Sequence, residues 1–462
     1  MRHTTTERPA TTAPAPGRDP APCSANVAAG FAAAFARDET GYITPLAVFF
    51  VTIFLFAGGF AVDLSHHHAA RTQLQAATDS VAHAALVTRR RGSVTEARSA
   101  ALELLETNMP RSRYGFTIQP EDIEFGRWVQ GSFEPSATGR QAVRVTGRRV
   151  DGRANALRTV LLRTVGVRSL DMTVTAAFTT FQPVCIDEGF VAEGKVDVQS
   201  NNNYLRGFCI HSNDHVRINQ NNYFEQGTIV SMPDLADLDI PNSGFERNEG
   251  LEAALREAWL DIRVLRELDD IVAGLRNHDG EYARPYIDDP GVLHRNLNQN
   301  NNRMDADDFT PGRIHEYSCV GQNQRITIPN GTLLSRIVLI TNCQVDMGSN
   351  VRLEDVTIAS TNTTSAAISG ASGVSIGRDD DCAPGGGAQI ITYGSMRFPA
   401  NMGIFGGQLI ALGDVEFAAR ADGVQGASII AGGVIDGTSN STMARCNTAE
   451  DHFYGAYYRM VL

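Results

Sequence analysis

The cysteines are the first residues whose type and spacing could do chemistry. The chain has seven, of which Cys23 lies near the N-terminus and the other six all follow residue 180. An even set in one part of the chain favours disulfide bonds and an oxidising compartment. The alternative is six buried free thiols in a cytosolic domain. The six are Cys185, Cys209, Cys319, Cys343, Cys382 and Cys446.

The first four of these cysteines fall into two pairs, each with members twenty-four positions apart. This spacing would place the two sulfurs of a pair on neighbouring turns of a repetitive fold. In the chain-entropy account, closing a loop of this size stabilises a fold by about 3 kcal/mol. Cys382 would then pair with Cys446 by elimination, although six cysteines allow fifteen pairings. The two spaced pairs are Cys185 with Cys209 and Cys319 with Cys343.

Histidine and aspartate clusters raise the question of a metal site. His66, His67 and His68 are consecutive, so on a helix they point about 100° apart and cannot all face one ion. Two acidic clusters could bind Ca²⁺ through carboxylate oxygens, but neither matches an EF-hand or the glycine-aspartate nonapeptide. We therefore expect no cofactor, with calcium as the alternative. The clusters are Asp379, Asp380 and Asp381, and Asp305, Asp307 and Asp308.

Catalytic side chains are harder to single out. Ser-His-Asp and Cys-His nucleophile signatures are absent from the sequence, and a glycosidase needs two carboxylates at a defined separation. Acidic residues recur in the repetitive part of the chain, but no spacing singles out a pair. We expect a protein that is not an enzyme. The recurring carboxylates are Asp197, Asp346, Asp414 and Asp436.

Residues 43–62 form an uncharged apolar run, which bears on where in the cell the protein lies. About twenty apolar residues suffice for one helix to cross a bilayer. The run lies too far from the N-terminus for an ordinary cleaved signal, so we expect a retained anchor. Residues 69–86 hold few helix breakers, which predicts that the helix continues beyond the membrane. Gly41 could mark a prepilin-type processing site, but the glutamate of such sites is absent.

Composition and charge indicate on which side the bulk of the protein lies. Residues 1–40 are rich in Thr, Ala and Pro, which predicts a disordered tail. Arg37 precedes the run and Arg71 follows it, so the positive charges on its two sides are nearly equal and do not indicate the orientation. The six distal cysteines favour an oxidising compartment for the C-terminal part. We therefore expect a bacterial inner-membrane protein with a cytoplasmic N-terminal tail and most of its residues in the periplasm. The formal net charge is -12 and Lys195 is the only lysine, so nucleic acid is not an expected partner.

A small α/β module is predicted after the anchor. Apolar residues at helical spacing predict a helix over residues 94–107, which Pro110 ends. Alternating stretches predict four strands, with a helix over residues 155–165 before the last of them. The predicted strands cover residues 115–119, 123–129, 142–150 and 171–181.

Short apolar pieces separated by Asn and Gly repeat after Cys185 with a period near nineteen residues. The sequence pattern of residues 195–204 recurs at residues 215–223, and that of residues 389–398 recurs at residues 408–417. Such coils need tight corners that accept positive φ, which Asn and Gly supply, and they must stack to bury their apolar faces. Stacked asparagines can then bond along the axis. We predict a right-handed-type parallel β-solenoid, with an irregular β-sandwich as the alternative.

Two segments of this region differ from the repeats. Residues 248–277 carry apolar residues at helical spacing, which predicts an inserted amphipathic helix. We expect it to pack on the solenoid flank rather than bind a partner. Residues 453–462 are aromatic and apolar. We expect them to cap the last coil rather than insert into a partner, because exposed solenoid ends aggregate.

The residues around the apolar run have the order and spacing of a known family. Arg37-Asp38 precede the run, Gly58-Gly59 lie near its end, and Ala82 to Ala85 follow it. This part, about residues 30–182, resembles the N-terminal region of TadG-like proteins of the Flp, or tight-adherence, pilus-assembly group (TadE/TadG-like). The positions that carry the motif are Gly41, Asp63, Arg71, Gln75 and Asp79.

The resemblance implies a pilus-associated location more than a task. Larger members of that group can carry a von Willebrand A-type domain with an Asp-x-Ser-x-Ser loop, which this chain lacks. Its C-terminal half instead looks like the solenoids of bactofilin-like polymers and of surface carbohydrate-active enzymes. We expect a structural component of pilus assembly whose solenoid is a docking scaffold. The alternative is a membrane-tethered solenoid that binds or cleaves envelope polysaccharide.

Four parts follow from these patterns. A tail (1–40) precedes a transmembrane and juxtamembrane helix (41–88), a periplasmic α/β module (89–182) and a solenoid (183–462) with a helical insertion at about residues 245–280. The expected partners are the inner membrane, other pilus-assembly proteins and a second copy of the chain through self-association.

Overall fold

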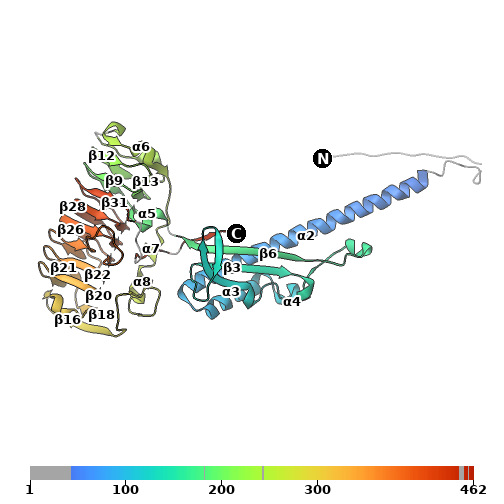
Figure 1. Cartoon of the computed structure of the whole chain (residues 1–462), viewed down its shortest axis with the longest axis horizontal. Coiled ribbons are helices and arrows are strands. Elements are labelled where there is room, and N and C mark those ends of the chain that lie inside the picture. Colours follow the sequence, from blue (N-terminus) through green and yellow to red (C-terminus); the bar gives the residue numbers. More distant parts are fainter. Residues whose placement is uncertain (1–42, 182, 242–243, 447–451, 456) are drawn as a thin grey trace, which may run out of the picture. The chain divides into compact units, whose positions relative to one another are not determined.

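The computed structural model describes residues 43–181, 183–241, 244–446, 452–455 and 457–462. They form two compact units (Figure 1). The first contains the described residues up to Thr72 together with Val150–Met172, and the second contains Gln73–Arg149 and Thr173–Leu462. The predicted tail, with Cys23 and Gly41, lies outside the described residues.

Helix α2 (Ile43–Arg91) is continuous for 49 residues, so the predicted extension of the apolar helix is confirmed. Among the described residues it is the one helix long and apolar enough to cross a membrane. Farther along, Leu74, Ala77, Val81 and Ala85 are buried. Their spacing of three or four places them on one helix face. The N-terminal part of the helix therefore exposes apolar side chains, and its C-terminal part packs one apolar face against the rest of the protein.

The α/β module contains a five-stranded sheet in the order β2-β1-β3-β6-β32. Helix α3 (Val94–Asn108) begins with a capping box between Ser93 and Glu96 and buries one apolar face. The strands are β1 (Ile123–Val129), β2 (Ser132–Pro135), β3 (Ala142–Arg149), β6 (Met172–Phe181) and β32 (Tyr457–Met460), and the short helices before β1 are α4 (Arg111–Tyr114) and η2 (Pro120–Asp122).

Two predicted elements of this module are wrong. Residues 115–119 form bends rather than a strand. Residues 155–165 belong to a hairpin rather than a helix, and Gly166, with a φ of 96°, ends the short helical turn at the tip of that hairpin. The hairpin consists of β4 (Leu157–Arg158), η4 (Leu162–Val165) and β5 (Ser169–Leu170), and η3 (Asp151–Arg153) precedes it.

Beyond residue 188 the chain forms the predicted parallel β-solenoid. Val216 pairs in register with Val196, and Ile218 with Val198, as the sequence repeat requires. Inward apolar side chains of successive coils stack into one continuous core. The first coil has β7 (Gly189–Ala192), β8 (Val196–Val198) and β9 (Asn203–Leu205), and the second has β10 (Cys209–Ser212), β11 (Val216–Ile218) and β12 (Asn222–Phe224).

The coils do not stack in chain order. The last coil (residues 428–444) pairs in parallel with the first (residues 189–205), and we call this pairing the seam. The chain enters the solenoid at the seam, adds coils as far as β15 (Leu255–Glu257), and crosses to the opposite end. It then returns from β16 (Val292–Leu297) to the seam. In Figure 1 the coils accordingly run from yellow through orange and red to green.

The longer block stacks in chain order. Leu409 pairs with Ile390 on one side and with Ile429 on the other, which matches the sequence echo. The remaining solenoid strands are β13 (Ile229–Met232), β14 (Asn248–Glu249), β17 (Asn301–Arg303), β18 (Arg313–Cys319), β19 (Arg325–Ile328), β20 (Leu333–Thr341), β21 (Gln344–Met347), β22 (Arg352–Ser360), β23 (Ile368–Gly370), β24 (Ser375–Ile376), β25 (Ala388–Thr392), β26 (Met396–Phe405), β27 (Gln408–Ala411), β28 (Val415–Gln425), β29 (Ser428–Ala431), β30 (Ile435–Asp436) and β31 (Thr442–Ala444).

The segment that connects the two blocks, residues 258–291, packs along the solenoid flank. Ile271 and Leu275 form an apolar cluster with strand residues such as Ile391 and Ile410, so the predicted flank packing is confirmed. The predicted single amphipathic helix over residues 248–277 is wrong: the chain is broken into short pieces, because residues 255–257 extend the coil and pair with β13. The connecting segment contains the short helices α7 (Arg263–Arg266) and α8 (Leu268–Gly274). Three more short helices precede it: η5 (Leu235–Asp237), η6 (Phe245–Arg247) and α6 (Leu251–Ala254).

The C-terminal strand β32 does not cap the solenoid. It pairs antiparallel with β6, with Tyr457 opposite Phe181. The capping expectation fails because the last coil in chain order lies inside the stack, where β7 already pairs with β29.

Asparagines at coil corners form the predicted ladders. Asn201, Asn221 and Asn440 have φ values of 62°, 60° and 58°, a left-handed conformation that asparagine tolerates. Nδ2 of Asn221 donates to Oδ1 of Asn201 at 3.1 Å, and Nδ2 of Asn201 donates to Oδ1 of Asn440 at 3.1 Å. The second of these contacts crosses the seam.

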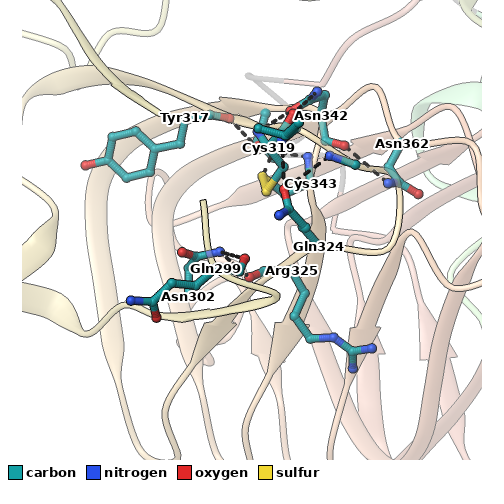
Figure 2. Close-up of a disulfide and its surroundings, with 12 residues drawn as sticks. Gln299, Asn302, Tyr317, Cys319, Gln324, Arg325, Asn342, Cys343 and Asn362 are labelled. Carbon is teal, nitrogen blue, oxygen red and sulfur yellow. Dashed lines mark hydrogen bonds between the residues drawn. A yellow bond between two sulfur atoms is a disulfide. The ribbon is translucent and has the colours of Figure 1, made fainter. Parts of the chain in front are cut away.

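Three disulfides hold parts of the solenoid together. Figure 2 shows one of them, beside which Asn342 bonds to both the N–H and the carbonyl of Cys319, at 2.7 and 2.9 Å. Nδ2 of Asn362 donates in turn to the carbonyl of Asn342 at 3.2 Å. A bridge and an amide ladder therefore fix the same corner. The disulfides are Cys185–Cys209, Cys319–Cys343 and Cys382–Cys446.

Replacement of Asn202 by alanine should weaken the seam. Asn202 is fully buried, its Nδ2 donates to the carbonyl of Thr438 at 2.8 Å, and its Oδ1 accepts from the N–H of Ser441 at 3.0 Å. Because buried partners would be left unpaired, we expect the free energy of unfolding to fall by about 1 to 3 kcal/mol. Denaturant unfolding of the full chain in detergent measures it. The control is the exposed Asn298→Ala, and equal losses in both variants would contradict the role of the ladder.

Buried histidines should make the stability of the solenoid depend on pH. Burial lowers the pKa of His211 and of His315, so the unfolded chain takes up protons first, near the ordinary value of about 6.5. Stability is therefore full above that pH and is lost as the pH falls towards the lowered pKa. We expect His211→Asn to flatten the decrease in melting temperature between about pH 7 and pH 5. The exposed His68→Asn should leave it unchanged, and an unaltered slope in His211→Asn would refute the assignment.

Candidate functional site

The outer end of the apolar run carries the first candidate site, which holds the hairpin against α2. Asp63 is only 1% exposed. Its carboxylate accepts hydrogen bonds from the N–H groups of Val160, Leu161 and Leu162 at 2.6, 2.8 and 2.6 Å. Successive backbone N–H groups that converge in a turn form a site for a negative charge. These N–H groups are committed to Asp63, and the predicted helix over residues 155–165 therefore does not form.

An apolar pocket of about 340 Å³ lies beside this contact. Gly59 marks the closest approach of the two elements, because a Cβ there would lie only 3.1 Å from the Cβ of Leu161. A glycine therefore lets the hairpin rest directly on the helix. The pocket is lined by Leu55, Phe56 and Phe60 of α2 and by Leu161, Leu162 and Val165 of the hairpin.

The other motif positions of the predicted family signature lie farther along α2. Nε2 of Gln75 donates to Oδ1 of Asp79 at 2.7 Å and to the carbonyl of Thr175 on β6 at 3.2 Å. These two residues therefore attach the helix to the sheet. Arg71 is exposed, and Gly41 lies outside the described residues.

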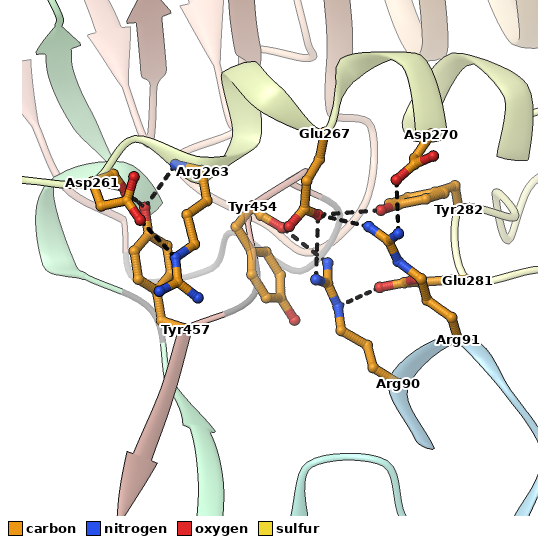
Figure 3. Close-up of polar contacts among 10 residues, drawn as sticks. All are labelled: Arg90, Arg91, Asp261, Arg263, Glu267, Asp270, Glu281, Tyr282, Tyr454 and Tyr457. Atoms are coloured by element: carbon orange, nitrogen blue, oxygen red, sulfur yellow. Dashed lines mark hydrogen bonds and ion pairs between the residues drawn. The ribbon is translucent and has the colours of Figure 1, made fainter. Parts of the chain in front are cut away.

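The C-terminal end of α2 carries the second candidate site, which we call the arginine cluster: Arg90 and Arg91 with Glu267, Asp270 and Glu281 (Figure 3). Nε of Arg90 lies 2.5 Å from Oε1 of Glu281, and its Nη1 lies 3.3 Å from Oε2 of Glu267. Nη1 of Arg91 lies 2.7 Å from Oδ2 of Asp270. The Arg90 side chain is 11% exposed and that of Arg91 is 47% exposed. Arg90 is therefore the buried member of the cluster.

The electrostatics keep both arginines charged. Burial alone would lower the pKa of Arg90, but Glu281 and Glu267 raise it above its ordinary value. The pKa of Arg91 is also raised, since its neighbours outweigh its burial. Cations at the end of a helix are further stabilised by the helix dipole. The residues that end α2 therefore also bind the segment connecting the two solenoid blocks.

The C-terminal segment joins the same region (Figure 3). Nη2 of Arg90 donates to the carbonyl of Tyr454 at 3.2 Å. The backbone N–H of Arg263 donates to the hydroxyl of Tyr457 at 3.2 Å, and burial raises the pKa of Tyr457 to about 12. Three segments that lie far apart in the sequence thus meet at the end of α2. No sequence pattern pointed to Arg90 and Arg91 as a contact site, because Arg90 and its partner Glu267 are 177 positions apart.

The acidic clusters considered as calcium ligands lie in ion pairs and helix caps. Asp379 pairs with Arg420 at 2.7 Å, and Asp380 pairs with Arg378 at 2.6 Å. Asp305 caps η7 (Ala306–Asp308). Within the described ranges no three His, Cys, Asp or Glu side chains are grouped as metal ligands.

Two of the recurring carboxylates meet at the seam. Asp436 pairs in register with Asp197 on the neighbouring coil, and Nε2 of Gln199 donates to both, at 3.0 and 3.3 Å. Lys195 also binds Asp197, at 2.7 Å. The other two lie elsewhere: Asp346 pairs with Arg325 at 2.7 Å, and Asp414 accepts a bond from the N–H of Val434 at 2.8 Å.

Comparison with known families assigns two parts of the chain. The family described as "Domain of unknown function (DUF7867)" matches residues 189–447, more than half of the chain. The family described as "Putative Flp pilus-assembly TadE/G-like" matches residues 41–98, which confirms the resemblance of the segment around the apolar run. No curated protein and no solved structure matches the chain.

Loss of Arg90 should cost more stability than loss of Arg91. Arg90→Ala leaves Glu281 with only the more exposed Arg91, 3.6 Å away, so we expect the free energy of unfolding to fall by about 1 to 3 kcal/mol. Arg91→Ala is the matched control and should cost less than about 1 kcal/mol, because exposed ion pairs contribute little. Denaturant unfolding of the full chain in detergent measures both.

A charge reversal sharpens this comparison. The double variant Arg90→Glu with Glu281→Arg should recover part of the loss seen with Arg90→Glu alone. Equal losses for Arg90→Ala and Arg91→Ala, or no recovery in the reversed pair, would show that the cluster does not hold these segments together.

Proposed function

Since the chain belongs to the DUF7867 family and carries a TadE/G-like segment, we propose that it is a membrane-anchored structural component of an Flp-type pilus-assembly system. In this proposal α2 crosses the inner membrane once, and the solenoid is a docking scaffold for other pilus-assembly proteins. The observation that carries the proposal is the continuity of α2. A single helix runs from the candidate span to the arginine cluster.

The disulfides support a location of the solenoid outside the cytoplasm. Three bridges within one domain are typical of an oxidising compartment. The proposed orientation therefore has the N-terminus in the cytoplasm and the solenoid in the periplasm. It places the bridged coils where pilus subunits are assembled.

The solenoid also suits a scaffold by its construction. Parallel pairing of neighbouring coils, asparagine ladders and bridges at the corners resist local rearrangement. Such an array offers extended, evenly spaced surfaces to partners. We propose that these surfaces bind proteins of the assembly system, a second copy of the chain included, and that the chain carries out no catalysis.

Complementation of a deletion strain tests this function. We expect deletion of the gene to reduce the surface pilin recovered by shearing, and the full chain to restore it. A variant without residues 183–446 keeps the TadE/G-like segment but should not restore assembly, because the docking surface is missing. Normal pilin levels after deletion would refute the pilus role, and full rescue by the shortened variant would refute the scaffold.

The same strains also show on which side of the inner membrane the solenoid lies. Intact cells are treated with a membrane-impermeant thiol reagent before and after reduction. Labelling of the six distal cysteines only after reduction is the expected result. If they react only after lysis, and without reduction, the solenoid is cytoplasmic and the proposed arrangement is wrong.

A further inference from the structure

The tip of the hairpin, residues 159–168, is closed by its own hydrogen bonds. The N–H of Thr159 donates to the carbonyl of Arg168 at 3.2 Å, and its Oγ1 donates to the carbonyl of Val167 at 2.6 Å. The N–H of Val167 donates to the carbonyl of Leu162 at 3.2 Å. These bonds pair part of the tip's backbone within the hairpin, which lowers the cost of bringing it into an apolar phase.

The side chains of this tip are unusual for a soluble turn. Val160, Leu161, Val165 and Val167 are 41 to 54% exposed. A cluster of exposed large aliphatic residues on one short turn marks a surface that contacts an apolar phase or a partner.

The depth of the tip is set by its contacts with α2. The N–H groups of Val160 to Leu162 bind Asp63, and Leu161 rests on Gly59. Gly59 lies three residues before Val62, the last residue of the apolar run, which corresponds to about 4.5 Å along a helix. A twenty-residue run spans about 30 Å, the thickness of the hydrocarbon core. Val165 lines the pocket together with Phe56 and Thr52, which lie about 9 and 15 Å before Val62, so the tip lies beside the C-terminal half of the run.

Basic residues alternate with these apolar ones. Arg158, Arg163 and Arg168 are all exposed and recur every five positions. Among the residues of the hairpin from Leu157 to Leu170 there is no acidic residue. Arginines next to a buried apolar surface extend their guanidinium groups to the phosphate level of a bilayer, where anionic lipids attract them.

We infer that the hairpin tip inserts into the bilayer beside α2 and that its arginines bind the phosphates of anionic phospholipids. The inference rests on the proposed membrane anchor and adds a second point of attachment to it. Continuity with the span identifies the occupant, because a tip clamped at Gly59 and Asp63 lies beside lipid whenever α2 is inserted. In this arrangement an acyl chain fills the pocket between Phe56, Phe60 and Val165.

Depth-dependent fluorescence quenching tests the inference. The full chain, with Trp128→Phe and Trp259→Phe, is reconstituted into phosphatidylcholine vesicles containing phosphatidylglycerol. Lipids brominated near the carbonyl end of the acyl chain are the quenchers. We expect Val165→Trp to be quenched at least about threefold more than the control Val320→Trp, whose valine is 88% exposed on the solenoid. Equal quenching of the two reporters would overturn the inference.

A third reporter separates failure of the inference from failure of the anchor. Phe54→Trp lies within the apolar run and should be quenched by lipids brominated near the acyl-chain end. If it is not quenched, the proposed membrane anchor itself is wrong. If it is quenched while Val165→Trp is not, the anchor stands and only the insertion of the hairpin is refuted.

A comparison of two lipid compositions tests whether the arginines of the hairpin bind anionic headgroups. Replacement of Arg158, Arg163 and Arg168 by glutamine should reduce the quenching of Val165→Trp in vesicles with phosphatidylglycerol. The same replacement should have little effect in vesicles of phosphatidylcholine alone. Identical effects in the two kinds of vesicle would refute binding of anionic headgroups.

Discussion

The seam between the last coil and the first coil is the constraint on which the rest of the structure depends. Strand β7 has a partner on each side, β10 and β29, so the chain has to enter and leave the solenoid in the middle of the stack. The entering strand β6 and the leaving strand β32 then pair with each other. The solenoid is thus an insertion between two neighbouring strands of the α/β sheet. Two chain connections, and not one, join it to the α/β sheet.

This arrangement explains where stability has to be concentrated. In a stack of repeats each coil is stabilised mainly by its neighbours, so the ends open first and the middle last. The seam lies in the middle, where Asn201, Asn202 and Gln199 connect coils that are more than two hundred residues apart in sequence. The open edge at β16 carries His294 and Arg295 on its exposed side, and charged residues on an edge oppose further strand addition. The seam is therefore held by several side-chain hydrogen bonds, whereas the edge at β16 presents polar side chains.

The sequence predicts a coil far better than it predicts the neighbours of that coil. Apolar periodicity and corner asparagines specify each turn locally, and the echo of residues 389–398 at 408–417 matches the observed register. Any coil with this pattern can stack on any other, however, so periodicity contains nothing that places residues 428–444 on residues 189–205. The hairpin shows a related limit. Its apolar residues at helical spacing contact α2, and the decisive group, Asp63, lies almost a hundred positions away. The arginines at the end of α2 likewise find their partners far along the chain.

The two attachments of α2 differ in how they respond to salt. At the C-terminal end of the run, Asp63 binds backbone N–H groups, which carry no titratable charge of their own. At the other end, Arg91 and Asp270 form an exposed pair that salt screens over about 8 Å at physiological strength. The side chains of Arg90 and Glu281 are only 11% and 18% exposed, so salt screens this pair less. Because Arg90 also donates to the carbonyl of Tyr454, it fixes the C-terminal segment as well as the connecting segment. A joint of this kind therefore keeps its geometry when the ionic strength changes.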